Sequence, residues 1–273
     1  MAHLLASGPR KQSRAGAELN YTDGPADARQ NGHVSGLVDG ARELGIELTP
    51  GQLAQLDQFG AALREGNRRV NLTRITNPAD VETRHFLDSL TAVLALRDRL
   101  RDEPELRLVD VGAGGGLPGL PLKIAFPRLR VTLVESVGKK AAFLEEVVRQ
   151  LGLPDVQVLN QRAEAAARDP GHRDSYDVAT ARALGRLPVV VELCAPFLAP
   201  GGLLVALRRG DLDAEVLAAA PAFKALKLWT RVPIPVGLPG LRDGRGLVVG
   251  EKYAATPEDY PRRAGMAAKR PLA

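Results

Sequence analysis

The sequence contains only one cysteine, Cys194. A single thiol excludes an internal disulfide and a cysteine-rich zinc site, and it is typical of proteins from a reducing compartment. Long hydrophobic runs are also missing, because the longest weakly charged stretch, residues 187–207, is interrupted by Glu192 and three prolines. Residues 1–6 lead into a basic stretch that begins at Arg10, which leaves no apolar segment of the length found in secretion signals. We therefore expect a cytoplasmic protein with no membrane partner.

The excess of charge of one sign is small. The chain has 37 Lys and Arg against 32 Asp and Glu, a net charge of +5, which permits a polyanionic partner without requiring one. Its 28 glycines and 20 prolines are too few for a collagen-like or low-complexity chain of 273 residues. Basic residues gather in two places: residues 62–74 hold four arginines, and residues 260–273 hold four basic residues and no acid.

The hydrophobic pattern divides the chain into three regions. Residues 1–33 show no sustained period, and we expect a disordered tail there. Residues 34–100 have helical spacing, with Thr49-Pro50 and Asn77-Pro78 as signals for helix starts. Residues 101–273 alternate short β-rich runs with helical stretches. The sequence thus predicts a small helical region in front of an α/β domain.

Five β-rich runs predict the main strands of that domain: residues 106–109, 130–134, 156–159, 177–180 and 203–207. Helical stretches, such as residues 138–151, separate them, so we expect βαβ units and a doubly wound, mostly parallel sheet. Two later runs, residues 226–234 and 247–253, are joined by a loop rich in Pro and Gly. They predict an antiparallel hairpin at the edge of the sheet.

A glycine-rich turn follows the first β-rich run. Gly112, Gly114 and Gly116 alternate along it, and a Gly-x-Gly-x-x-Gly pattern ends at Gly119. Such glycines let the backbone turn sharply and approach a ligand closely, although a tight strand-to-helix turn is the simpler alternative. Glu135 lies at the end of the second β-rich run, where a carboxylate can accept hydrogen bonds from ribose hydroxyls. This spacing favours a nucleoside-containing cofactor.

Asp110 helps to decide which of two common cofactors, NAD or S-adenosylmethionine (SAM), the loop binds. A dinucleotide such as NAD presents a pyrophosphate, whereas SAM has no phosphate and carries a cationic sulfonium and an ammonium group. A carboxylate two residues before the first glycine suits the cationic cofactor better. We therefore expect SAM, with NAD as the less favoured alternative. The pattern acid-x-Gly-x-Gly-x-Gly resembles motif I of class I SAM-dependent methyltransferases.

Further motifs make the resemblance more specific. They lie at residues 67–73 (NRRVNLT), 84–90 (RHFLDSL), 110–122, 134–136, 139–140, 143–144, 162–164 (RAE), 180–183 (TARA) and 260–272. From about residue 37 to its end, the chain resembles the RsmG family, also called GidB, of bacterial 16S rRNA guanine-N7 methyltransferases. It departs from the family in its long tail, residues 1–33, and at Ala267, where a proline is expected.

The resemblance implies a Rossmann-like SAM-binding domain over residues 101–273 with a basic C-terminal tail. It implies methyl transfer from SAM to N7 of a guanine in the decoding-region (530) loop of 16S rRNA. The partner is then 16S rRNA or the small ribosomal subunit, and we expect a monomer. N7 of guanine is a bare lone pair that attacks the methyl group without losing a proton, so no general base is needed. We predict no metal site, and Cys194 lies in an apolar stretch suited to core packing.

For the cofactor, the resemblance implies Gly112 and Leu117 in the loop, Ala163 and Glu164 after the third strand, and Arg182 after the fourth. Gly114 and Gly116 belong to the same turn, and Glu135 is the ribose acceptor by position. Read without the family, Ala163-Glu164 is a helix start with an acid in its first turn, and Arg182 is a surface residue or a salt-bridge partner. We predict that Arg182 is the catalytic residue, acting by positioning rather than by proton transfer.

The two basic clusters supply the predicted contacts to RNA phosphates. These are Arg68 and Arg69 in the first cluster, and Arg262 and Arg263 in the tail. Solvated protein surface is the simpler alternative for all four. His85 lies in an apolar helical stretch, and we interpret it as a hydrogen-bonded core histidine. Two other functions stay open: methylation of a small molecule or protein, and an NAD-binding protein.

Overall fold

The computed structural model describes residues 32–102 and 105–272. The predicted tail therefore lies, up to residue 31, outside the described residues. Within the described ranges no helix is long and apolar enough to cross a bilayer.

The first described part is helical. It consists of α1 (Gly32–Glu43), α2 (Pro50–Asn67), α3 (Pro78–Val81), the π-helical turn η1 (Glu82–Leu87), α4 (Asp88–Leu90) and α5 (Val93–Asp102). The predicted start signals are confirmed. The Thr49 hydroxyl accepts a hydrogen bond from Gln52 N while the Gln52 side chain accepts one from Thr49 N, and Asn77 caps α3 in front of Pro78.

The second part is built on one sheet of eight strands. The strands are β1 (Arg107–Val111), β2 (Arg130–Val134), β3 (Val156–Leu159), β4 (Tyr176–Arg182), β5 (Leu198–Arg209), β6 (Leu228–Thr230), β7 (Ile234–Pro235) and β8 (Arg245–Lys252). Their order is β3-β2-β1-β4-β5-β8-β6, with β7 also paired to β8. Strands β1 to β5 are parallel, and β8 is antiparallel to β5, β6 and β7. The predicted doubly wound, mostly parallel sheet is confirmed.

The predicted antiparallel hairpin at the edge of the sheet is confirmed, but its first strand is interrupted. The edge strand β6 pairs with β8, and β8 pairs with β5 on its other side. The run predicted at residues 226–234 forms two short strands, β6 and β7. Pro233, which lies between the two strands, explains the interruption, because proline lacks the N–H that a continuous ladder needs.

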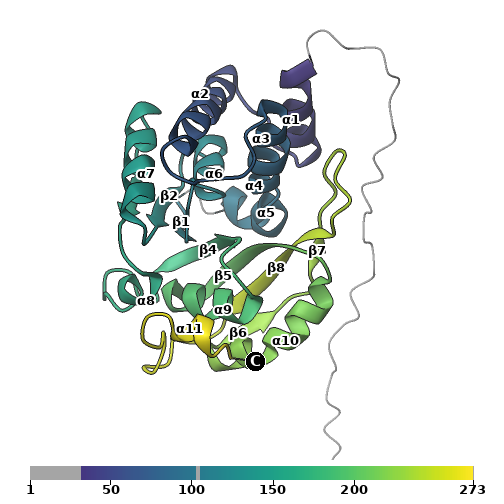
Figure 1. The fold of residues 1–273 in the computed structure, drawn as a ribbon. Helices are drawn as coiled ribbons and strands as arrows, with labels where there is room; N and C mark the ends of the chain where they lie inside the picture. The colour runs from purple at the N-terminus through teal and green to yellow at the C-terminus, as the bar shows by residue number, and fades with distance from the viewer. Residues whose placement is uncertain (1–31, 103–104, 273) are drawn as a thin grey trace, which may run out of the picture.

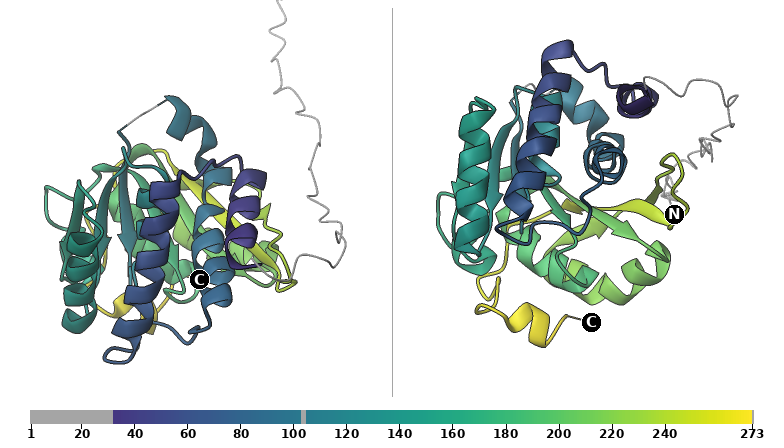
Figure 2. Two further views of the ribbon diagram at one scale, coloured as in Figure 1. Left: turned by 90° about the horizontal axis from the view of Figure 1, so that it is seen from above. Right: turned by 45° about the horizontal axis from the view of Figure 1, so that its top comes forward.

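Helices cover both faces of the sheet (Figures 1 and 2). With α1 to α5, the helices α6 (Gly119–Ala125) and α7 (Gly138–Gln150) share one core, and α8 (Ala163–Ala166), α9 (Leu187–Cys194), the 3₁₀ turn η2 (Ala195–Phe197) and α10 (Leu212–Ala225) share the other. Cys194 is fully buried in the second core, as predicted. A last short helix, α11 (Met266–Lys269), packs against α9.

The strand order predicts a ligand site beyond the carboxyl ends of the central strands. After β3 the chain crosses back to β4, which pairs with β1 on the side opposite β2. In open α/β sheets ligands bind beyond the carboxyl ends of the strands, at the point where the order reverses. The loop after β1 and the end of β4 both lie at this point.

Candidate functional site

The glycine loop follows β1 with three residues in left-handed conformations. The φ angles of Gly112, Gly114 and Gly116 are +73°, +56° and +87°, a region that side-chain-bearing residues adopt at a cost. The Gly112 amide donates to the Val134 carbonyl oxygen at 2.9 Å, which ties the loop to the end of β2. A Cβ atom on Gly112 would overlap the Leu184 side chain. The loop is therefore fixed in a conformation that requires glycine.

Asp110 holds the base of this loop. Its fully buried carboxylate accepts hydrogen bonds from Gly119 N at 2.9 Å and from the Thr180 hydroxyl at 3.1 Å. Burial raises the pKa of Asp110 to about 6, although both hydrogen bonds lower it. The acid that favoured SAM in the sequence thus joins the start of α6 to β4.

We expect Asp110→Asn to be increasingly more stable than the wild type as the pH rises. An asparagine oxygen still accepts from Gly119 N, and its amide group donates to Thr180, whose hydroxyl turns toward the Val109 carbonyl oxygen 3.5 Å away. Because its pKa is raised, Asp110 stabilises the fold at low pH, and this stability is lost as the pH rises from about 4 through about 6.

Denaturant unfolding of both proteins at pH 4 and pH 7 measures this difference. The full shift of about two pKa units is worth about 3 kcal/mol, and the variant should gain about 2 kcal/mol of it relative to the wild type between pH 4 and pH 7. His85 titrates in both proteins and cancels in the comparison. A constant difference across the range would show that Asp110 has an ordinary pKa.

Glu135 braces the glycine loop from the end of β2. One carboxylate oxygen accepts from Gly114 N at 3.0 Å and the other from Val137 N at 2.7 Å. The residue is 6% exposed. Each oxygen keeps a second lone pair, so the predicted role as ribose acceptor is chemically compatible with the bracing role.

A pocket of about 210 Å³ lies at the carboxyl ends of the strands. Its wall consists of Val111, Gly112, Val134, Ser136, residues 161–164, Leu184, Val189, Leu193, Gly265, Ala267 and Ala268. The predicted residues Gly112, Ala163 and Glu164 thus meet in one wall. Glu135 lies between the wall residues Val134 and Ser136, whereas Gly114, Gly116, Leu117 and Arg182 are outside the lining.

Glu164 has a partner that the sequence did not predict. Its carboxylate accepts a hydrogen bond from Gly265 N at 2.7 Å, and the residue is 8% exposed. The C-terminal part of the chain therefore forms one side of the pocket.

Arg182 ends β4 inside a buried polar network. Its Nη1 donates to the Arg84 carbonyl oxygen at 3.2 Å and to Asp88 at 3.0 Å, and its Nη2 lies 3.2 Å from His85 Nδ1. Asp88 also accepts from Arg245 at 2.5 Å. The salt-bridge alternative is therefore present, and it ties the end of β4 to the N-terminal helices.

His85 is the neutral member of this network. It is 5% exposed, and its Nε2 lies 2.8 Å from the Thr73 hydroxyl, which confirms a hydrogen-bonded core histidine. Burial and the charge of Arg182 lower the pKa of His85 to about 4. The RHFLDSL and NRRVNLT motifs therefore meet each other and β4 in the fold.

The four arginines predicted to bind RNA lie in different surroundings. Arg68 and Arg69 follow the end of α2, and Arg68 is paired to Glu65 at 2.7 Å on an exposed surface. Arg263 is exposed, whereas Arg262 forms an ion pair with the buried Glu192. The observed partner of Arg262 is thus Glu192 of the same chain. Contact with RNA stays a prediction for all four arginines.

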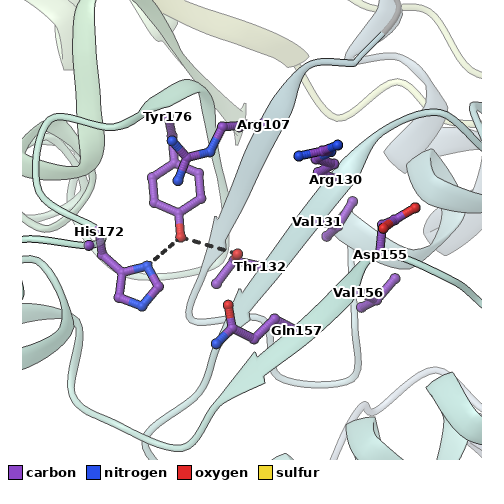
Figure 3. Close-up of a pocket in the computed structure, with 10 residues that line it drawn as sticks. Arg107, Arg130, Val131, Thr132, Asp155, Val156, Gln157, His172 and Tyr176 are labelled. Atoms are coloured by element: carbon purple, nitrogen blue, oxygen red, sulfur yellow. Dashed lines mark hydrogen bonds between the residues drawn. The ribbon is translucent and has the colours of Figure 1, made fainter.

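A larger cavity, about 530 Å³, lies at the opposite ends of the strands, where they begin (Figure 3). It is formed by the first residues of the strands, where the Tyr176 hydroxyl lies 2.6 Å from His172 Nδ1 and 3.1 Å from the Thr132 hydroxyl. The Arg107 guanidinium lies over the Tyr176 ring, 5.0 Å from its centroid. None of the residues predicted for the cofactor lines this cavity, so we assign the functional site to the smaller pocket.

Comparisons with known proteins identify the family of this chain. The family model for rRNA small subunit methyltransferase G, GidB, matches residues 52–231. Ribosomal RNA small subunit methyltransferase G of Dehalococcoides mccartyi is 45% identical over 236 residues, which cover 86% of this chain and 98% of the relative. The same enzyme of Roseiflexus castenholzii is 47% identical over 232 residues, covering 85% and 97%.

Among solved structures, precorrin-6y C5,15-methyltransferase from Geobacter metallireducens is similar with a TM-score of 0.43 at 15% identity, covering 60% of this chain and 88% of that one. The family match, residues 52–231, includes most of the helical region, the glycine loop and strands β1 to β6. The chain therefore belongs to the rRNA small subunit methyltransferase G (GidB) family of SAM-dependent methyltransferases.

Proposed function

We propose that this protein transfers the methyl group of SAM to N7 of a guanine in 16S rRNA. The observation that carries the proposal is the pocket beside the glycine loop, in a chain that shares 45–47% identity with ribosomal RNA methyltransferases. In its finer form, the target lies in the 530 loop of the decoding region, within 16S rRNA or the small subunit. The enzyme acts as a cytoplasmic monomer, with residues 101–273 as its catalytic domain behind a helical region, residues 34–100.

The residues present fit SAM. Gly112 lies where a Cβ would close the wall against Leu184, so the backbone itself is the contact surface. Val189 and Leu193 supply apolar wall for the adenine, and Glu135 supplies lone pairs for the ribose hydroxyls. Bound there, SAM would supply an electrophilic methyl group on a sulfonium.

The residues of this chain position the substrate and the cofactor, and none of them has to act as an acid or a base. Because N7 attacks without losing a proton, the protein must align the guanine with the methyl group and exclude water. Arg182 suits this role because Asp88 and Arg84 fix its guanidinium, and at least two of its five N–H groups have no partner among the described residues.

The turn after α2 is the best-placed surface for RNA. Leu63 of α2 and Leu72 pack against Gly115 of the glycine loop, so this turn adjoins the pocket's loop. Arg68 and Arg69 lie between those leucines in the chain and are exposed. Phosphates of an RNA that places its guanine at the pocket can therefore reach them.

We expect the double variant Arg68→Ala and Arg69→Ala to bind RNA more weakly and with a smaller salt dependence. Each lost phosphate contact should lower the slope of log K against log salt by about 1. SAM affinity should not change. The matched control replaces Arg101 and Arg128, two exposed arginines that flank another cavity. A salt slope equal to that of the control variant would remove this turn from the RNA surface.

The function is tested with SAM labelled in its methyl group. The protein is incubated with small ribosomal subunits, with free 16S rRNA, and with ribosome-free extract containing proteins and metabolites. We expect label in 16S rRNA. Label only in protein or small molecules would support the alternative methyltransferase, and absence of SAM binding would support a nucleotide-binding protein of another kind.

A further inference from the structure

The C-terminal segment, residues 254–272, lies on the side of the sheet that carries α9 and is held there by hydrogen bonds (Figures 1 and 2). Arg173 donates hydrogen bonds to three of the segment's carbonyl oxygens, at 2.8, 3.0 and 3.1 Å. Arg168 donates to the carbonyl oxygen of Pro261 at 2.5 Å. These bonds satisfy backbone groups that have no partner in regular structure, and they fix the path of the segment up to residue 261.

The next residue, Arg262, meets a buried acid on α9. Its Nε and Nη2 donate to the two carboxylate oxygens of Glu192 at 2.8 and 2.5 Å, and its backbone N–H donates to the same carboxylate at 3.2 Å. Glu192 is 1% exposed, so Arg262 compensates a charge that is removed from water. Val189 and Leu193 of the same helix line the cofactor pocket.

Beyond this pair the segment reaches the pocket itself. Gly265 N donates to Glu164 at 2.7 Å, and Gly265, Ala267 and Ala268 form part of the pocket wall. Ala267 is 1% exposed. All three residues are small, which lets the backbone approach α9 and the pocket closely.

We propose that Arg262 is a positioning residue for cofactor binding: through Glu192 it holds residues 265–268 in place as the outer wall of the SAM pocket. This inference rests on the proposed function, because it takes this pocket as the SAM site. It separates two neighbouring arginines that the sequence groups together. Arg262 faces the protein, whereas the exposed Arg263 is available to RNA.

Three variants test this difference. We expect Arg262→Ala to raise the dissociation constant for SAM at least 10-fold in calorimetry, because the wall loses its anchor. Arg262→Lys keeps one charge without the two-pronged contact and should recover part of the affinity. Arg263→Ala is the matched control, with wild-type SAM affinity and weaker RNA binding. Equal SAM affinity of Arg262→Ala and Arg263→Ala would overturn the proposal.

A fourth variant tests the same wall without disturbing Glu192, because Arg262→Ala leaves that buried carboxylate without its partner and could lose its fold. Ala268 lies on the wall with an exposed side chain, so Ala268→Phe should fold normally. We expect it to change SAM affinity several-fold by altering the wall. An unchanged affinity would contradict the assignment of residues 265–268 to the cofactor.

The coupling between SAM binding and the C-terminal segment can also be measured in the wild-type protein. If docking of the C-terminal segment raises the affinity for SAM, then bound SAM must raise the equilibrium constant for docking by the same factor. Saturating SAM should therefore slow trypsin cleavage after Arg263 in the full-length wild-type protein and have less effect in Arg262→Ala. Cleavage at the same rate with and without SAM would show that the segment is not coupled to the cofactor.

The pocket is tested separately with Ala163→Phe, which enlarges a side chain of the pocket wall outside the C-terminal segment. If this folded variant keeps wild-type SAM affinity, the proposed SAM site itself is wrong. If it loses affinity while Arg262→Ala does not, the site stands and only the role of the C-terminal segment is wrong.

Discussion

Replacing Arg182 with alanine should lower the single-turnover rate of methyl transfer about 30- to 1000-fold, or about 2–4 kcal/mol. The side chain is held by Asp88 and Arg84 and is 15% exposed, so its remaining N–H groups are presented from a fixed position. Although burial lowers the pKa of Arg182, Asp88 opposes the change, and the guanidinium stays charged at any working pH. We therefore expect a loss of rate without a shift of the pH optimum.

The rate is measured at saturating SAM with 16S rRNA and compared among folded variants. Arg182→Lys should recover activity only in part, because a point charge cannot replace a planar fork held by several acceptors. Arg186→Ala is the control, since Arg186 is an exposed arginine four residues away. A rate for Arg182→Ala close to that of the control would leave Arg182 only its structural contact with Asp88.

Glu135→Ala should weaken SAM binding roughly 30-fold or more, about 2 kcal/mol. The substitution removes the acceptor for Gly114 N and Val137 N and, in our proposal, the acceptor for the ribose. The glycine loop then loses its brace at the same time as the cofactor loses a hydrogen-bond partner. Glu135→Gln keeps an oxygen for one amide only and should bind SAM with intermediate affinity.

Calorimetry with SAM measures this effect, with unfolding measured in parallel. Glu145→Ala serves as the control, because Glu145 is an exposed acid on the following helix. If Glu135→Ala binds SAM as the control does, Glu135 braces the loop without contributing to the cofactor site.

Local patterns predicted most of the sheet because each signal lies within a few residues. The runs at residues 130–134 and 156–159 coincide with β2 and β3, and Thr49 and Asn77 cap helices where their spacing to proline indicates. The edge hairpin was predicted in its place, but its first run, residues 226–234, was predicted as continuous and forms two short strands. Strand β8 pairs with β5 on its other side, and its apolar residues are buried.

The partners of the site residues were beyond the reach of local patterns. Arg182 and Asp88 are 94 residues apart, and Arg262 and Glu192 are 70 apart. One signal was present in the sequence: Glu192 lies in an apolar stretch, and a carboxylate buried there requires a cation or donors. The sequence indicates the need for a partner, but only the fold shows that it is Arg262.

In the proposed function, the protein transfers the methyl group of SAM held in this pocket to one ring nitrogen of one rRNA base. The most direct measurement is mass spectrometry of nuclease fragments of 16S rRNA after reaction with SAM and the wild-type protein. We predict a single added methyl group, at N7 of a guanine, that is absent when Arg182→Ala is used for the same short time. A methyl group on another atom or base, or RNA left unmodified while SAM is bound, would contradict the account.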